Sequence, residues 1–292
     1  MLWILIKRNV KLFFKDKGMF LTSLITPVIL LVLYATFLGN VYRDSFTMNL
    51  PEWVMIPEKL LDGLVGGQLV SSLLAVSCVT VAFCSNFLMV QDKATGTIKD
   101  LLISPVKASI LSLSYYVAAL FATLLICLAA TGICLGYLTL IGWYLSTADV
   151  LCLLLDVVLL VLFGTALSSV INFFLSSQGQ ISAVGTVVSS GYGFICGAYM
   201  PISSFSPGLQ KVISFLPGTY GTALMRNHAM QGALVEMEKQ GIPVGELKDT
   251  LDCNLYFFEK QVSIPAMYGI LAGTIVMLIA LYILLNSYKK SR

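Results

Sequence analysis

The chain has 292 residues, of which 58% are apolar and only 11% are charged, whereas about a quarter of the residues in soluble domains carry a charge. This composition excludes an ordinary soluble domain and indicates a polytopic membrane protein. The net charge of +3 is small, and we attribute it to membrane topology and not to nucleic-acid binding.

Residues 1–17 form the first predicted element, an amphipathic helix in the membrane interface. The apolar side of this helix consists of Trp3, Ile6, Val10, Phe13 and Phe14. Its cationic side consists of Lys7, Arg8, Lys11 and Lys15. Such a helix places its apolar side in lipid and its cations toward anionic head groups. The alternative is a segment that only directs membrane insertion. Because no small-residue cleavage site precedes the next apolar run, we expect that run to be retained.

Six apolar runs follow, each long enough to cross a membrane as a helix. They are residues 20–39, 64–90, 108–144, 150–175, 181–199 and 264–285. Backbone polar groups in hydrocarbon must be satisfied internally, and the runs lack the alternation of barrel strands, so we predict six transmembrane helices in an all-α fold. Residues 1–292 then form a single transmembrane domain. Most bases lie on the side of the two termini, which the positive-inside rule makes cytoplasmic.

The segment 91–107 is a charged island between the second and third runs. Thr97 and Asp100 fit a capping box at a helix start, and Pro105 discourages continuation of that helix. One short apolar face would consist of Ile98, Leu101 and Leu102. So short a helix has little stability alone, and we expect another molecule to pack against it. The alternative is a loop that only tucks its leucines into lipid.

Two features stand out inside the later runs. The fifth run has small residues at four-residue spacing, which let another helix approach closely, namely Gly185, Ser189, Gly193 and Gly197. We expect this ladder to face a second copy of the chain, with packing inside one chain as the alternative. Asp156 lies in an apolar run, where a charge must be neutralised, paired or hydrated. A contact with substrate or a proton is one interpretation, and the favoured one is a structural hydrogen bond to a neighbouring helix.

Residues 201–263 are predicted to form an external hairpin and cap. The first part is semi-apolar and is broken at Pro207 and at Leu216-Pro217-Gly218. This pattern predicts two short helices that dip back into the membrane, because proline and glycine interrupt helices. The polar residues 232–261 should stand outside.

Several catalytic motifs are absent from the sequence. It has no phosphate-binding Gly-x-x-x-x-Gly-Lys-Ser/Thr loop, no Gly-x-Ser-x-Gly turn, and one histidine only, which excludes a His-x-x-x-His metal site. We therefore expect no catalytic residue, no metal and no cofactor bound by this chain.

Together these elements carry a family likeness. The chain resembles an ABC-2 type exporter permease in its amphipathic start, its six spans and its Leu216-Pro217 hairpin. The resemblance also lies in three residue pairs of the cytoplasmic loop, namely Gly96-Thr97, Leu101-Leu102 and Ser104-Pro105. The likeness covers essentially the whole chain, and a narrower one is to haemolysin and multidrug export permeases of Gram-positive bacteria. It implies a permease of the bacterial plasma membrane that exports an amphiphilic, drug-like or toxin-like substrate. Its partners would be a second permease copy, membrane lipid, and an ABC nucleotide-binding ATPase subunit that holds ATP and Mg²⁺. The alternative is a polytopic membrane enzyme or an assembly scaffold that works without an ATPase.

The resemblance also implies roles for particular residues. The coupling element seated in the ATPase would comprise Asp92, Lys93, Gly96, Thr97, Leu101 and Leu102, although the family often has Glu and Arg at the first two positions. A substrate path between the second and fifth spans, chosen here by polarity, would be lined by Ser71, Ser72, Ser77, Thr80, Ser85, Asn86, Thr186, Ser189, Ser190 and Tyr192. The hairpin containing Leu216 and Pro217 would act as an outer gate.

Overall fold

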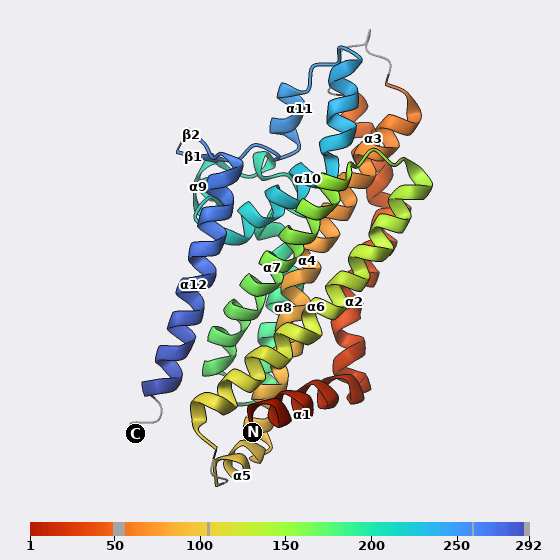
Figure 1. The fold of residues 1–292 in the computed structure, drawn as a ribbon. Coiled ribbons are helices and arrows are strands. Elements are labelled where there is room, and N and C mark those ends of the chain that lie inside the picture. The colour runs from red at the N-terminus through yellow and green to blue at the C-terminus, as the bar shows by residue number, and fades with distance from the viewer. Residues whose placement is uncertain (49–55, 104–105, 259, 289–292) are drawn as a thin grey trace.

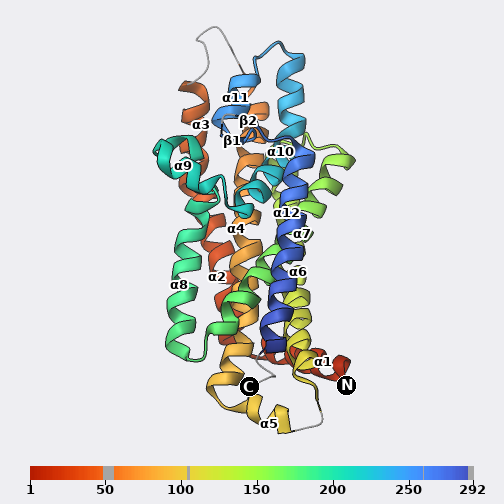
Figure 2. The ribbon, with the colours of Figure 1, turned by 90° about the vertical axis from the view of Figure 1, so that its left-hand side faces the viewer.

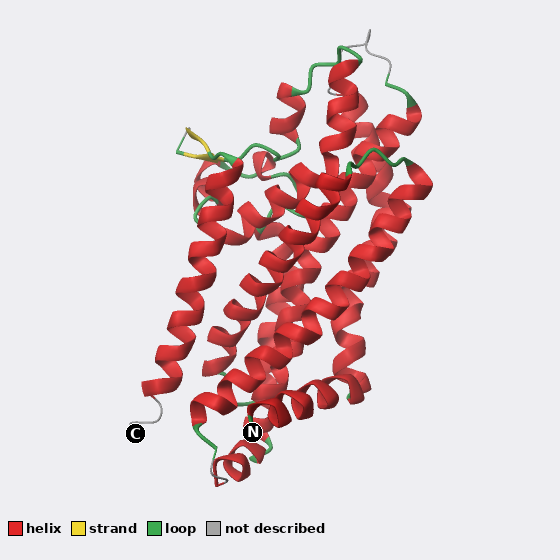
Figure 3. Ribbon diagram, in the orientation of Figure 1, coloured by secondary structure: helices red, strands yellow, loops and turns green. Residues whose placement is uncertain are grey.

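The apolar runs form long helices that lie side by side along one axis, as Figure 1 shows and Figure 3 repeats by secondary structure. The computed structural model describes residues 1–48, 56–103, 106–258 and 260–288, so Ser104 and Pro105 of the predicted loop motif lie outside the described residues. In chain order the elements are α1 (Leu2–Lys15), α2 (Lys17–Leu33), the π-helix η1 (Tyr34–Leu38), α3 (Gly39–Met48), α4 (Glu58–Ala94), α5 (Thr97–Ile103), α6 (Ala108–Ile141), α7 (Thr147–Phe174), α8 (Gln178–Ile195), the 3-10 helix η2 (Ile202–Ser204), α9 (Pro207–Ile213), α10 (Pro217–Lys239), α11 (Gly245–Thr250), the antiparallel strands β1 (Tyr256–Phe257) and β2 (Lys260–Gln261), and α12 (Ile264–Tyr288).

Helix α4 is the centre of the bundle. It packs against α2, α6, α7, α8 and α10, and nearly all of its side chains from Leu60 to Val90 are buried. Polar side chains such as Ser71, Ser77 and Asn86 lie among the apolar residues of α4, and a central position keeps them out of lipid. The predicted second span therefore becomes the element around which the others are arranged.

Five segments in the described part of the chain are long and apolar enough to cross a membrane. They are Lys17–Asp44, Glu58–Ala94, Ala108–Ile141, Thr147–Phe174 and Ile264–Asn286. The chain is thus a mostly helical, multi-pass membrane protein. The fifth predicted span, residues 181–199, corresponds to α8, a helix of 18 residues, and its crossing of the membrane stays a prediction. Figure 2 shows α8 at the edge of the bundle, where α4 is its main neighbour.

Helix α1 lies across one end of the bundle, below the ends of α2 and α6 (Figure 1). It buries Leu5, Ile6, Asn9 and Phe13 against the chain, whereas Trp3 is 73% exposed. Ile6 and Phe13 of the predicted apolar side are therefore buried against the protein and Trp3 is not, and the contact of that side with lipid stays a prediction. We call the end with α1 and α5 the proximal end, and the end with α9, α11 and the strands the distal end.

The distal end follows the predicted proline breaks. Pro207 and Pro217 each occupy the first turn of a helix, α9 and α10 respectively, where proline is tolerated because its missing N–H is not needed. Helix α10 runs on to Lys239, beyond the boundary expected near residue 230. It packs against α4, α7 and α12. The penetration of this hairpin into the membrane stays a prediction.

Candidate functional site

A buried carboxylate joins three helices at the proximal end. Asp92, in the last turn of α4, accepts a hydrogen bond from Arg8 Nη1 at 2.8 Å and another from the Tyr115 hydroxyl at 2.5 Å. Next to it, Asn9 Nδ2 donates to Ser114 Oγ at 3.2 Å. We call these five residues the α1 clasp, because they fasten α1 to α4 and α6.

The ion pair within the α1 clasp, Arg8 with Asp92, is largely withdrawn from solvent. The side chains of Arg8 and Asp92 are 28% and 10% exposed. Burial acts to lower the pKa of the Arg8 guanidinium, but the hydrogen bond and negative charge of Asp92 outweigh it and raise that pKa above its usual value. The charge of Asp92, assigned above to contact with another subunit, is therefore engaged inside the chain.

Lys93 caps a different helix. Its ammonium group donates to the carbonyl oxygens of Asn172, Phe173 and Leu175 at 2.9, 2.9 and 3.1 Å, and it lies 5.7 Å from the centre of the Phe173 ring. The last carbonyls of a helix lack intrahelical donors and carry partial negative charge, so a cation there stabilises the end of α7. Two consecutive residues thus tie the end of α4 to α1 and α6 on one side and to α7 on the other.

A glycine turn separates α4 from α5. Gly96 has φ of +82°, a left-handed conformation that glycine adopts at little cost. The predicted capping box would place Thr97 just before the helix, but Thr97 is the first residue of α5. Its hydroxyl lies 2.9 Å from the hydroxyl of Thr95. The coupling segment expected over residues 91–107 therefore begins with the last turn of α4.

Helix α5 turns part of its apolar face inward. Ile98 and Leu101 are partly buried against the core of the chain, whereas Ile103 is 85% exposed. Lys99 and Asp100 are also exposed. Leu102 belongs to α5, but its side chain is outside the described part of the chain. The sequence pattern did not select Ile103, because this residue follows Leu102 and lies outside the i, i+3, i+4 spacing of the predicted apolar face.

A lateral groove of about 930 Å³ opens between α2, α4 and α8. Three of the predicted path residues on α8 line it, namely Thr186, Ser189 and Ser190, together with Gly185 of the small-residue ladder. The opposite walls are mostly apolar, with Ile29 and Leu33 of α2 among them, but they also carry Thr22 and Tyr34. The groove is therefore largely apolar, and its hydroxyl groups are most numerous on α8.

The predicted path residues on α4 do not line this groove but are buried inside the protein. Ser71, Ser72, Ser77, Thr80, Ser85 and Asn86 are each 0 to 4% exposed. Asn86 Nδ2 donates to Ser168 and Ser169 of α7 at 3.0 and 2.6 Å, while the hydroxyls of Ser77 and Ser85 find no hydrogen-bond partner among the described residues. In this conformation the chain does not bring the α4 and α8 halves of the predicted path together.

The small-residue ladder is partly used within the chain. Gly193 makes room for the Tyr199 ring, and Gly197 ends α8 with φ of +74°. Ser189 and Gly185 line the groove. The predicted outer-gate residues Leu216 and Pro217 begin α10, and the next residue, Gly218, lies against the Tyr192 hydroxyl.

Asp156 meets two partners from neighbouring helices. Its Oδ2 lies 2.6 Å from His228 Nδ1 of α10, and its Oδ1 accepts a hydrogen bond from the Tyr268 hydroxyl of α12 at 2.7 Å. Sequence reasoning did not select His228 or Tyr268. The available signal was that His228 is the single histidine of the chain.

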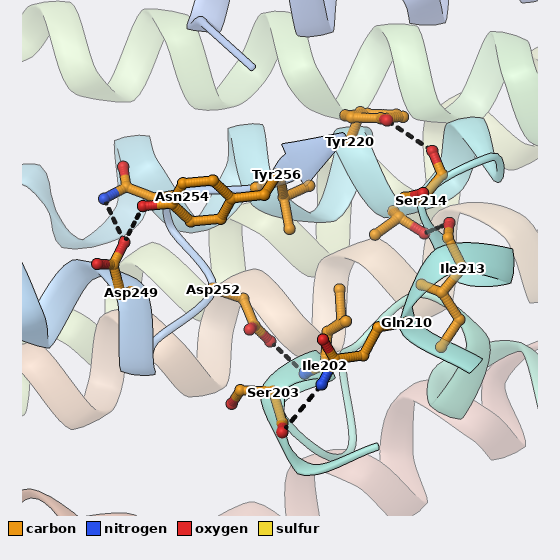
Figure 4. A pocket seen from close by; sticks show the side chains of 12 residues that line it. Ile202, Ser203, Gln210, Ile213, Ser214, Tyr220, Asp249, Asp252, Asn254 and Tyr256 are labelled. Carbon is orange, nitrogen blue, oxygen red and sulfur yellow. Dashed lines mark hydrogen bonds between the residues drawn. The ribbon is translucent and has the colours of Figure 1, made fainter. Parts of the chain in front are cut away.

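A second cavity, of about 320 Å³, lies at the distal end between the hairpin and the segment after α11 (Figure 4). Asp252 accepts a hydrogen bond there from the Ile202 backbone at 2.7 Å, and Asp249 accepts from Asn254 and Tyr256 at 2.8 and 2.9 Å. Behind the cavity, Arg226 lies 3.4 Å from Asp252 and donates to the Gly197 carbonyl at 2.7 Å. These contacts hold the loop after α11 onto the end of α8 and onto α10.

These features define a helical membrane protein with an N-terminal helix across one end of the bundle and a short helix projecting between two spans. The chain matches the model of the ABC-2 type transporter family over residues 1–230. It therefore belongs to this family, whose members are membrane components of ABC transporters and are not themselves catalytic. The family implies partnership with an ABC ATPase subunit. No curated protein matches the chain.

Proposed function

We propose that this chain is the permease of an ATP-driven exporter and that α5 is the element on which the ATPase subunit docks. The observation that carries the proposal is the orientation of α5. Ile98 and Leu101 anchor the helix to the chain, while Lys99, Asp100 and Ile103 stand outward at the proximal end. An exposed isoleucine beside two opposite charges suits a protein surface better than lipid.

The charges support a cytoplasmic proximal end in a bacterial plasma membrane. Lys7, Lys11, Lys15 and Lys17 line α1 and the start of α2 at this end, and basic residues favour the cytoplasmic side. ATP and Mg²⁺ would be held by the partner subunit. The partner's movement on binding ATP would reach α1, α6 and α7 through Asp92 and Lys93, because both residues tie the base of α5 to those helices.

The lateral groove supports an amphiphilic, drug-like or toxin-like cargo. Its mostly apolar walls and the hydroxyl groups of α8 suit a molecule with an apolar body and a polar group. Helix α8 leaves much of its outer face uncovered, which favours a second permease copy alongside it. Export would need α8 to move relative to α4, because the α4 half of the predicted path is sealed. The hydroxyls of Ser77 and Ser85, which have no hydrogen-bond partner in the part of the chain that the structure describes, favour a second state in which they reach water or cargo.

The docking role is tested by Ile103→Asp in the full-length permease expressed with its ATPase. We expect the ATPase to be lost from the purified complex while the permease keeps its unfolding temperature, since Ile103 contacts solvent. The matched control is Val235→Asp, which is 36% exposed near the end of α10 and should keep the ATPase. Leu101→Asp should instead lower stability. An Ile103→Asp permease that retains its ATPase in full would refute the docking role.

The groove is tested separately by Gly185→Leu. The added side chain enters the groove beside Phe87, so we expect export to fall at least about tenfold with the complex intact. Gly179→Leu is the matched control, because nothing lies within 4 Å of that position. Equal transport by both variants would exclude the groove as the path.

A further inference from the structure

Three polar side chains from three helices meet in the apolar interior of the distal half. Asp156 of α7 is 1% exposed and has a distinct partner at each oxygen, His228 of α10 and Tyr268 of α12. The imidazole and phenol rings stack with centroids 6.3 Å apart. We call these three residues the Asp156 cluster.

The charge of this cluster depends on a single proton. The Tyr268 hydroxyl donates to the carboxylate, and so does a protonated Nδ1 of His228, which leaves Nε2 free to hold or release a second proton. With that proton bound, the imidazolium balances the carboxylate and the cluster is neutral. Without it, a carboxylate stays buried with no counter-charge, which is costly in an apolar interior.

The charges nearest to the cluster along α10 are paired elsewhere. Arg226, two positions before His228, pairs with Asp252 and donates to the Gly197 carbonyl, and Glu236 and Lys239 pair with each other in the last turns of the helix. Among the described residues, the other titratable groups that interact with the cluster are thiols: Cys152 on α7, Cys78 on α4, and Cys127 of α6 behind Cys78. The protein itself leaves the imidazole partly uncovered, since the His228 side chain is 14% exposed.

We infer that Asp156 and His228 form a binding site for one exchangeable proton, and that the protonated pair holds α10 against α7 and α12. Proton loss from Nε2 to solvent leaves the uncompensated carboxylate and loosens α10. The proton site stands on the contacts of the cluster alone. Its further role, as a latch on the outer gate of a transporter, rests on the proposed function.

The single histidine makes the proton directly observable. Full-length permease with isotope-labelled histidine and a histidine-free affinity tag, in lipid nanodiscs, should give one imidazole resonance that titrates with pH. Asp156→Asn removes the carboxylate that favours the imidazolium, so the midpoint should fall by at least about one pH unit, a tenfold loss in proton affinity. Tyr268→Phe removes a donor that stabilises the carboxylate, so the midpoint should rise.

The two shifts have opposite signs, which a role in packing alone does not produce. The matched control is Tyr116→Phe, because the Tyr116 hydroxyl is buried with no hydrogen-bond partner among the described residues, and it should leave the midpoint unchanged. If Asp156→Asn does not fold, the rise in Tyr268→Phe remains as the test. An unchanged midpoint in Tyr268→Phe, or one that moves with Tyr116→Phe equally, would overturn the proton site.

A thiol reports whether the cluster holds α10. Cys253 is 1% exposed, and its carbonyl accepts a hydrogen bond at 2.6 Å from Asn227, the neighbour of His228. At one fixed pH, a charged thiol reagent should label Cys253 at least about fivefold faster in His228→Gln than in the wild type, after subtraction of a Cys253→Ser background. Equal labelling rates would refute the latch. Both measurements omit the ATPase, so their outcome is independent of the Ile103→Asp test.

Discussion

Arg8 and Asp92 are 84 residues apart in the sequence and are joined by a hydrogen bond of 2.8 Å between guanidinium and carboxylate. The same carboxylate oxygen accepts from Tyr115. One residue near the end of α4 therefore holds α1 and the third predicted span together, directly before the Gly96 turn that leads into α5.

Asp92→Asn should loosen the proximal end. It removes the charge that pairs with Arg8, and hydrogen bonds to charged groups contribute about 1.5–3 kcal/mol each. We expect the free energy of unfolding in mixed micelles to fall by roughly that amount. The control is Lys239→Ala, which breaks an exposed pair with Glu236 and should change the free energy by about 0.5 kcal/mol or less. Equal effects of the two substitutions would contradict a structural role for the α1 clasp.

Lys93→Met should fray the end of α7. The substitution keeps the apolar stem but removes the ammonium group from three carbonyls, and a cation at a helix end contributes up to about 2 kcal/mol in partly buried geometries. Hydrogen exchange of the amides in residues 170–175 should become faster. The exposed Lys99 provides the control as Lys99→Met, which should leave exchange in α7 unaltered. Unchanged exchange in Lys93→Met would argue against the cap.

Arg226→Met should destabilise the distal end strongly at neutral pH. Arg226 and Asp252 are 1% and 5% exposed, so the substitution strands a buried carboxylate, which costs about 3–5 kcal/mol. Addition of Asp252→Asn should recover most of the loss, since asparagine tolerates the left-handed φ of +50° at this position. Arg43→Met, in a pair with Asp62 that is more than a third exposed, is the control and should cost about 1 kcal/mol at most.

The same variant should show a distinctive pH dependence. Burial raises the pKa of the Asp252 carboxyl above its usual value, although Arg226 opposes the rise. The folded form therefore prefers the protonated carboxyl. The stability from this preference is complete below the usual carboxyl pKa and is lost as pH rises through the raised one. Without Arg226 the pKa of the Asp252 carboxyl rises further, so the loss becomes larger and extends to higher pH, and acidification should restore the stability of Arg226→Met. A pH-independent deficit would show that its instability has another cause.

Gly232→Ala should strain the contact between α10 and the loop before α7. A Cβ atom at Gly232 would overlap the Tyr144 carbonyl. Overpacking of this kind costs about 1–3 kcal/mol. We expect a lower unfolding temperature. Gly132→Ala is the control, because nothing lies within 4 Å of its added methyl group, and it should be neutral or stabilising in its helix. Matching temperatures for both variants would contradict the close approach.

The membrane class and much of the helix pattern followed from the sequence alone. Apolar length predicted the spans, and proline placed the starts of α9 and α10 at Pro207 and Pro217. Thr97 and Asp100 indicated the start of α5. These features are local, since run length, a missing N–H and a helix start depend on residues close in the chain.

Only the tertiary structure decided which partners the polar residues take. Helical periodicity placed Ile98 and Leu101 on one face, but it could not show that the chain itself covers them and leaves Ile103 outside. The pairs Arg8 with Asp92 and Asp156 with His228 join residues 84 and 72 positions apart. Such pairs depend on how helices pack across the bundle, which side-chain spacing within one helix does not encode. The sequence by itself thus determined that this is a multi-pass membrane protein with a short helix between two spans. The packing of α4 among its neighbours decided which charges are held inside and which surface is left for a partner.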